Sequence, residues 1–188
     1  MRGEQSGVKP VAARLSAREQ AWCLTANRWG ARQAVRAYFR FVSRLGDGTF
    51  WYALMLMLAL CDGWRGLGAA AHLAVVGGIA TLLYRRLKRW TRRPRPFAAD
   101  GRIQAWIAPL DEYSFPSGHT LHAVTFTLVA LAYYPSLIWL LLPFTLSVAA
   151  SRVVLGMHYP SDVIAAGGIG ALLASASLWL VPGVSLLG

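Results

Sequence analysis

The chain has 188 residues, of which 56% are hydrophobic and 14% charged, and its formal net charge is +11. Soluble domains are about 45–50% apolar and about 25% charged, so this composition argues against a soluble domain and favours an integral membrane protein. A chain this basic could bind nucleic acid, but its Lys and Arg residues lie beside long apolar runs rather than in a separate polar module. We therefore expect no nucleic-acid partner.

The N-terminal part of the chain divides into a polar tail and an amphipathic segment. Residues 1–17 predict a polar tail without the apolar stretch of a cleavable signal peptide. Residues 18–47 predict a helical segment in the membrane interface, because within 31–45 apolar and basic side chains fall on opposite arcs of a helical wheel. The apolar arc holds Val35, Tyr38, Phe39, Val42 and Leu45, and the basic arc holds Arg32, Arg36, Arg40 and Arg44.

Five apolar runs with almost no charge follow this segment. Several are short against the roughly 17–25 residues that cross a bilayer core, but five in succession are not typical of a soluble protein. We therefore predict an all-α, multi-pass transmembrane helix bundle with about five spanning helices, in addition to the N-terminal interfacial amphipathic helix. The runs cover residues 48–62, 67–84, 119–134, 136–150 and 163–182.

The glycines within these runs predict close contacts between helices, because small residues let helix backbones approach one another in membranes. They occur as Gly77-Gly78 and Gly167-Gly168-Gly170. The tryptophans predict anchors at the membrane–water interface. They include Trp51, Trp64, Trp106, Trp139 and Trp179.

Two polar segments, 85–118 and 151–162, interrupt the apolar runs. With five spanning helices, both segments emerge on the membrane face that also carries the N-terminus. Acidic and aromatic residues line the loop before Pro116; they could gate the substrate or only solvate the loop, and we expect the latter. These loop residues are Asp100, Asp111, Glu112 and Tyr113. Three groups of residues could take part in a reaction: Lys88 with Arg95-Pro96, Pro116-Ser117-Gly118-His119, and Ser151-Arg152 with His158 and Asp162.

These residue types suit a phosphoryl-transfer site, which needs cations and fixed donors around the phosphate oxygens. The cations would be Lys88, Arg95 and Arg152; arginine offers a planar fork of donors and lysine a compact charge. Ser117 and Gly118 precede a helix whose N-terminal amides point toward a bound anion.

The two histidines can divide the remaining chemistry. A neutral imidazole at His158 can attack phosphorus and form a phosphohistidine. Asp162, four residues later, can orient one ring nitrogen of His158, as in a catalytic triad. His119, at a helix N-terminus, is placed to protonate the leaving group.

The three groups resemble the three motifs of the type-2 phosphatidic acid phosphatase (PAP2) superfamily. Residues 88–96 are similar to KxxxxxxRP, 116–119 to PSGH and 151–162 to SRxxxxxHxxxD, in the family's order and without a substitution. The resemblance covers about residues 50–182 and implies that residues 48–188 form a membrane phosphatase domain.

The resemblance also implies a role for each matching residue and a chemistry without a metal or other cofactor. It implies that His158 is the nucleophile, Asp162 its partner and His119 the general acid. The residues implied in phosphate binding are Lys88, Arg95, Ser117, Gly118 and Arg152.

The expected activity is removal of phosphate from a lipid phosphate or diphosphate in the bilayer. Phosphatidic acid, phosphatidylglycerophosphate and a polyprenyl diphosphate such as undecaprenyl diphosphate all fit, and the sequence indicates neither which is used nor the oligomeric state. Two other classes stay open, which are a vanadate-dependent haloperoxidase-like enzyme and a catalytically inactive membrane protein of the same fold.

The expected location is a bacterial-type inner (cytoplasmic) membrane. Eighteen of the nineteen Lys and Arg residues lie before residue 50, within 85–118 or at Arg152, and only Arg65 lies toward the other face. The positive-inside rule therefore predicts that the N-terminus and the active site share the cytoplasmic face. The resemblance to bacterial members of the family predicts the opposite face for the active site. Most of those members have six spanning helices, one of which takes the place of the arginine-striped segment of this chain.

Overall fold

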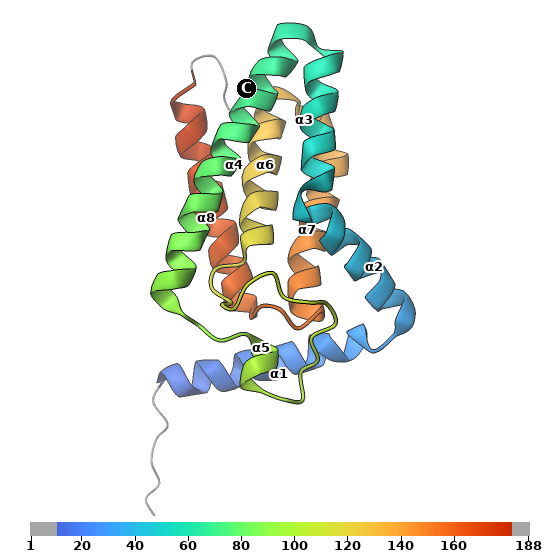
Figure 1. Cartoon of the computed structure of the whole chain (residues 1–188), viewed down its shortest axis with the longest axis vertical. Helices are drawn as coiled ribbons and strands as arrows, with labels where there is room; N and C mark the ends of the chain where they lie inside the picture. The colour runs from blue at the N-terminus through green and yellow to red at the C-terminus, as the bar shows by residue number, and fades with distance from the viewer. Residues whose placement is uncertain (1–10, 182–188) are drawn as a thin grey trace, which may run out of the picture.

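The computed structural model describes the backbone of residues 11–181 and the side chains of residues 17–181. The described residues form eight α-helices, one π-helical turn (η1) and one 3-10 turn (η2), and no strand occurs among them (Figure 1). The elements are α1 (Val11–Gly30), α2 (Gln33–Arg44), η1 (Leu45–Thr49), α3 (Phe50–Cys61), α4 (Gly63–Thr91), α5 (Pro96–Ala99), α6 (Gly118–Tyr133), η2 (Pro135–Leu137), α7 (Ile138–Val154) and α8 (Pro160–Trp179).

Each of the five predicted apolar runs is a helix, which confirms the all-α membrane bundle. Three stretches are long and apolar enough to cross a membrane, namely Gly63–Thr91, Pro135–Val154 and Pro160–Trp179. The other two helices, α3 with 12 residues and α6 with 16, are shorter. The count of about five spanning helices therefore stays a prediction.

The short helix α6 is the centre of the bundle and packs against α4, α7 and α8, while α3 pairs with α4 (Figure 1). Half of its residues are buried, and several carry hydroxyl groups that bond inside the bundle. Thr127 and Thr145 hydroxyls lie 2.6 Å apart, and the Thr125 hydroxyl donates to the Gly170 carbonyl. The other helices therefore shield α6 from lipid, and its length need not match the bilayer.

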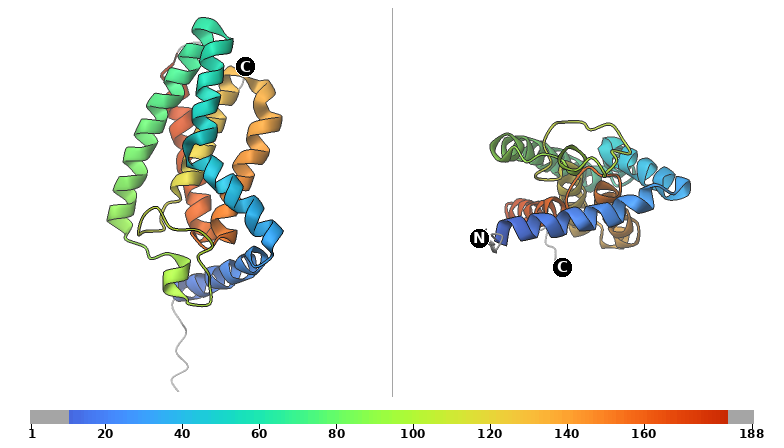
Figure 2. Two further views of the ribbon diagram at one scale, coloured as in Figure 1. Left: turned by 45° about the vertical axis from the view of Figure 1, so that its right-hand side comes forward. Right: turned by 90° about the horizontal axis from the view of Figure 1, so that it is seen from below.

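The amphipathic segment 31–45 forms α2, which slopes from α1 up to α3 (Figure 1). Viewed from below, α1 lies across the ends of the bundle helices, where it contacts α7 and α8 (Figure 2). It begins at Val11, inside the range expected to be a polar tail, and residues 1–10 lie outside the described residues. An orientation across the helix ends is the one that an interfacial helix adopts.

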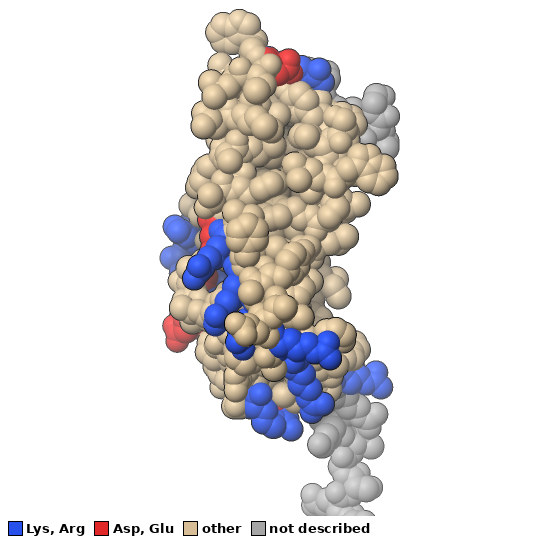
Figure 3. Space-filling model, turned by 90° about the vertical axis from the view of Figure 1, so that its right-hand side faces the viewer, with Lys and Arg blue, Asp and Glu red and all other residues tan. Residues whose placement is uncertain are grey.

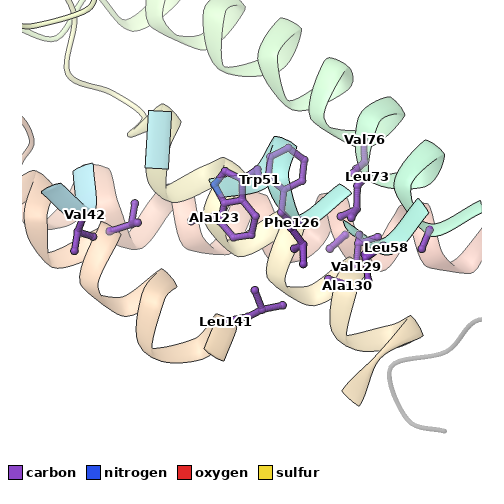
Figure 4. Packing of buried hydrophobic residues seen from close by; sticks show 14 residues of the cluster. Val42, Trp51, Leu58, Leu73, Val76, Ala123, Phe126, Val129, Ala130 and Leu141 are labelled. Carbon is purple, nitrogen blue, oxygen red and sulfur yellow. The ribbon is translucent and has the colours of Figure 1, made fainter. Parts of the chain in front are cut away.

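The main hydrophobic core lies where α3, α4, α6 and α7 meet (Figure 4). Trp51 is at its centre with only 2% of its surface exposed, and its ring centroid lies 5.1 Å from that of Phe126. The prediction that Trp51 anchors the interface is therefore wrong. Because α3 begins part-way along the bundle, Trp51 in its first turn packs into the core rather than at the membrane surface. Trp64, Trp139 and Trp179 are more than 85% exposed, as interface anchors would be.

Two of the predicted glycine contacts are present. A Cβ atom at Gly77 of α4 would lie 2.7 Å from the ring of Phe126, and one at Gly170 of α8 would lie 2.8 Å from the Leu121 carbonyl oxygen. Both glycines therefore let their helices approach α6 closely. Gly78, Gly167 and Gly168 have no atom within 4 Å of an added Cβ and do not contribute in this way.

The charged residues separate along the length of the molecule. Figure 3 shows the Lys and Arg side chains gathered over the lower part, with a broad region above them that is almost free of charge. That lower part contains α1, α2 and the loop between α5 and α6 (Figure 1). The separation matches a protein whose apolar body is in the bilayer and whose basic end is at one surface.

The α3–α4 hairpin depends on Gly66. A Cβ atom there would lie 1.8 Å from the backbone oxygen of Leu58 in α3, so Gly66→Ala must push the two helices apart. We expect the free energy of unfolding to fall by about 1–3 kcal/mol, which is measured as a lower melting temperature in detergent. Gly68→Ala is the matched control, because it is on the same helix and an added Cβ meets no atom. Equal melting temperatures for the two variants would contradict this interpretation.

Candidate active site

A cavity of about 1140 Å³ opens among the lower ends of α4 and α6, η1 and the loop after α5. Its polar end is lined by six of the eight predicted site residues: Lys88, Arg95, Gly118, His119, Arg152 and His158. Its walls continue into an apolar part that includes Trp51, Met55, Ala74, Leu82 and Phe126. Ser117 and Asp162 are fully buried behind the polar end.

The predicted residues meet because each lies at or next to a helix end. Lys88 is in the last turn of α4, Arg95 is the N-cap of α5 and His119 is in the first turn of α6. Arg152 is in the last turn of α7, and His158 lies in the short connection before α8. The ends of antiparallel helices alternate between the two faces, so these ends converge on one face.

His158 is 1% exposed, and its Nδ1 lies 3.6 Å from Oδ2 of Asp162. Nδ1 has no hydrogen-bond partner among the described residues, so Asp162 faces the ring without yet binding it. Burial, reinforced by the nearby charges of Arg152, Arg95 and Lys88, holds the pKa of the His158 imidazole well below its usual value. The ring is therefore neutral at physiological pH, which is the state that a nucleophile requires.

Arg93 is a residue near the site that the sequence did not single out. Its guanidinium donates to Asp162 Oδ1 at 2.7 Å and to Glu19 Oε2 of α1 at 2.6 Å, and it stacks 4.1 Å from the ring centroid of Tyr159. Asp162 Oδ2 also accepts the Tyr159 backbone N–H. Arg93 thus fixes the orientation of the Asp162 carboxylate and connects it to α1.

Lys88 and Arg95 both contact Asp111, in the loop before α6. The Lys88 ammonium lies 2.7 and 2.6 Å from the two carboxylate oxygens of Asp111, and the Arg95 guanidinium donates to Oδ1 at 2.7 Å. Burial alone would raise the pKa of the Asp111 carboxyl, but the bonds and charges of these two cations lower it below its usual value. The prediction that Asp111 only solvates the loop is therefore wrong.

Arg152 is 3% exposed and donates from Nη1 to the hydroxyl of Ser43, in α2. Its Nε has no hydrogen-bond partner, and among the described residues no carboxylate forms an ion pair with it. The side chain is therefore a buried cation with unused donors beside the cavity, as a phosphate-binding arginine must be.

His119 donates a hydrogen bond from Nε2 to the carboxylate of Asp47, a contact that the sequence also did not reveal. Asp47 is in η1, between Gly46 and Gly48, and Gly48 has a φ of 134°, which only glycine adopts without strain. The Gly-Asp-Gly sequence was the signal available, since it marks a backbone turn that presents the aspartate. Asp47 thereby limits the orientation of the His119 ring.

Ser117 and Gly118 begin α6 in different ways. The Ser117 hydroxyl accepts the Thr120 backbone N–H and is therefore the helix N-cap, turned away from the cavity. Gly118 lines the cavity beside the ring of Tyr84, with 3.5 Å between that ring and an added Cβ. The half-buried backbone at Gly118 and the N-terminus of α6 can face a bound anion.

Comparison with known proteins identifies relatives that are similar to this chain in sequence. An undecaprenyl-diphosphatase of Sulfolobus acidocaldarius is 29% identical over 73% of this chain and 66% of that protein. A decaprenylphosphoryl-5-phosphoribose phosphatase of Mycolicibacterium smegmatis is 33% identical over 71% of this chain and 72% of that protein. The chain spans 46% of the length of a bacitracin transport permease protein of Bacillus licheniformis and 29% of that of a phosphatidylglycerophosphatase B of Escherichia coli.

A crystal structure shows the same fold. The transmembrane PAP2-type phosphatidylglycerolphosphate phosphatase from Bacillus subtilis superposes with a TM-score of 0.72 at 22% identity, over 92% of this chain and 88% of that chain. The family model of the PAP2 superfamily matches residues 67–185, which include all three motifs. The chain therefore belongs to the PAP2 superfamily.

Proposed function

We propose that this chain is an integral-membrane phosphatase that hydrolyses a lipid phosphate or diphosphate through a phosphohistidine intermediate. The observation that carries the proposal is a single cavity with three buried cations and a neutral His158 at one end and apolar walls at the other. Such a cavity suits a molecule with an anionic head and an apolar tail. The apolar walls also favour a lipid over the small polar substrates of a haloperoxidase.

The relatives support the same substrate class. Two of them are phosphatases of polyprenyl-linked phosphates or diphosphates, and the structural neighbour is a phosphatidylglycerolphosphate phosphatase. All three substrates combine a phosphate group with a long apolar chain. A polyprenyl diphosphate, phosphatidic acid and phosphatidylglycerophosphate are therefore the substrates to compare.

In the proposed first step, His158 attacks phosphorus and the bond from phosphorus to the leaving oxygen breaks. Because Nδ1 of His158 faces Asp162, Nε2 is the attacking atom. The positive charge that develops on the ring is stabilised by the Asp162 carboxylate, which Arg93 holds in place. Lys88, Arg95 and Arg152 bind the phosphoryl oxygens, where negative charge is concentrated.

His119 transfers its proton to the leaving oxygen, so that a lipid alcohol or lipid phosphate departs. In the second step His119 takes a proton from water, the oxygen of that water attacks phosphorus, and the bond between phosphorus and His158 breaks. Inorganic phosphate is released, and both histidines return to their starting states.

Loss of His158 tests the covalent mechanism. We expect His158→Ala to abolish phosphate release from each of the three lipids, because it removes the attacking nitrogen. His119→Ala should reduce turnover by about 10²–10⁴-fold, the usual contribution of a general acid. A His158→Ala protein that melts like the wild type and keeps near-normal activity would rule out the phosphohistidine.

The chemistry is proposed to need no metal ion. Among the described residues, no three His, Cys, Asp or Glu side chains are grouped as ligands of a metal ion. We expect EDTA to leave phosphate release unchanged, and vanadate to inhibit competitively because it mimics the transferring phosphoryl group. Loss of activity with EDTA and recovery with a divalent cation would contradict the metal-free mechanism.

The proposed location is a bacterial-type inner membrane with the active site on the cytoplasmic face. When the three site cations are set aside, fifteen Lys and Arg residues remain on the face of the N-terminus against Arg65 on the other. Under the positive-inside rule this asymmetry favours a cytoplasmic basic end.

Cysteine labelling in intact cells tests the sidedness. Native Cys61 is exposed at the end of α3, near Arg65, and Gly101 is exposed at the opposite, catalytic end. An impermeant maleimide should label Cys61 in the wild type. In a Cys61→Ser, Gly101→Cys protein, it should react only after the cells are permeabilised. Ready labelling of position 101 in intact cells would place the active site outside the cytoplasm.

A further inference from the structure

The ammonium group of Lys88 has three N–H donors, and the loop before α6 takes all three. Two contacts go to the carboxylate oxygens of Asp111, at 2.7 and 2.6 Å, and the third goes to the Tyr113 carbonyl at 3.0 Å. In this arrangement Lys88 has no donor for another anion. A phosphate oxygen can bind Lys88 only where an oxygen of this loop leaves.

Arg95 is occupied by the same loop residue. It donates from Nη2 to the Asp111 carboxylate at 2.7 Å and from Nε to the Asp111 backbone carbonyl at 3.0 Å. Its Nη1 donates to the Met157 carbonyl, on the other side of the site. One carboxylate therefore bridges two of the cations assigned to phosphate, in the way that two oxygens of a phosphate would.

The charges explain why a carboxylate belongs at this place. The three cations are each at most 6% exposed: Lys88, Arg95 and Arg152. Because buried positive charges repel one another and have lost their hydration, they require an anion close by. Asp111 is the one carboxylate among the described residues within 4 Å of Lys88 or Arg95. A phosphate dianion at the same cations supplies more charge than the carboxylate and repels it, so the two cannot share the position.

Few hydrogen bonds other than those of Asp111 hold the loop of residues 107–112. Its ends are fixed, since the Trp106 N–H donates to the Leu155 carbonyl and the Ser114 N–H donates to the Arg93 carbonyl. Within residues 107–112, the only hydrogen bonds in the described structure are those of Asp111. The segment is largely exposed, and 74% of the Leu110 surface is accessible. Release of Asp111 therefore frees the whole segment.

We propose that Asp111 is an internal substitute for the substrate phosphate, and that phosphate binding displaces it and releases residues 107–112 from the mouth of the cavity. The inference rests on the proposed function, since it takes Lys88 and Arg95 as phosphate ligands. Leu110 lines this cavity, so release of the segment widens the entrance as the anionic head arrives.

A spin label in the segment tests the displacement directly, because the amides of 107–112 donate no hydrogen bond in the described structure and a side-chain probe is needed to report motion. In a Cys61→Ser, Leu110→Cys protein labelled in detergent, vanadate or inorganic phosphate should raise the mobility of the label, measured by electron paramagnetic resonance. Slower amide exchange in the N-terminal turn of α6, which begins at Gly118, shows in the same protein that the ligand is bound. Unchanged or lower mobility of the label, with protection of α6, would overturn the proposal.

Charge removal gives a second test. Asp111→Asn should lower the dissociation constant for inorganic phosphate, measured by calorimetry, by about tenfold, which corresponds to about 1.4 kcal/mol. Glu112→Gln is the matched control, because it removes the same charge at the next residue. In the described structure the Glu112 side chain bonds neither Lys88 nor Arg95. The control should change the constant by less than about twofold, as exposed charges have small effects.

The outcomes separate the two proposals. Weaker or unchanged phosphate binding in Asp111→Asn, or an equal gain in Glu112→Gln, would overturn the displacement of Asp111. A second outcome combines two measurements: Asp111→Asn binds phosphate more tightly than the wild type, and the wild type releases no phosphate from any lipid. That outcome would support the displacement and contradict the phosphatase function.

Discussion

Three cationic side chains, Lys88, Arg95 and Arg152, are buried together at one end of an otherwise apolar helix bundle. Mutual repulsion and loss of hydration both oppose such a cluster, so it persists only where anions and hydrogen-bond acceptors surround it. The connections between helices supply the Asp111 carboxylate and the Met157 and Tyr113 carbonyls, and α2 supplies the Ser43 hydroxyl. The loops at this end are shaped by the charges that they enclose.

The amphipathic N-terminal region completes the same end from below. Glu19 of α1 accepts from Arg93 and from the Ser161 backbone N–H, so it reaches the first turn of α8. Asn27, further along α1, bonds the backbone of the loop after α5 at Gln104 and the end of α7 at Val154. These bonds join a surface helix to the elements that carry His158 and Asp162. In this chain α1 is therefore part of the support of the site.

The sequence predicted the bundle and the motif residues because both depend on local patterns. Apolar runs determine where helices form, and the motifs lie at helix ends, which must converge when helices alternate in direction. The partners of those residues follow no local pattern. Asp47 and His119 are 72 positions apart, and Asp111 lies in a loop without periodicity, so only the folded chain shows their contacts. Trp51 was misplaced because a helix that starts inside the bundle has the same sequence pattern as one that starts at its surface.

The concentration of charge at one end has a consequence for the lipid supply (Figure 3). The helix α4 has 29 residues and is about 44 Å long at 1.5 Å per residue, so the two ends of the molecule lie near opposite leaflets. A lipid in the far leaflet cannot bring its headgroup to Lys88 at the lower end of α4. Under the proposed function, only one leaflet therefore supplies the substrate, and a lipid made in the other leaflet would first have to be flipped across the bilayer by a separate process.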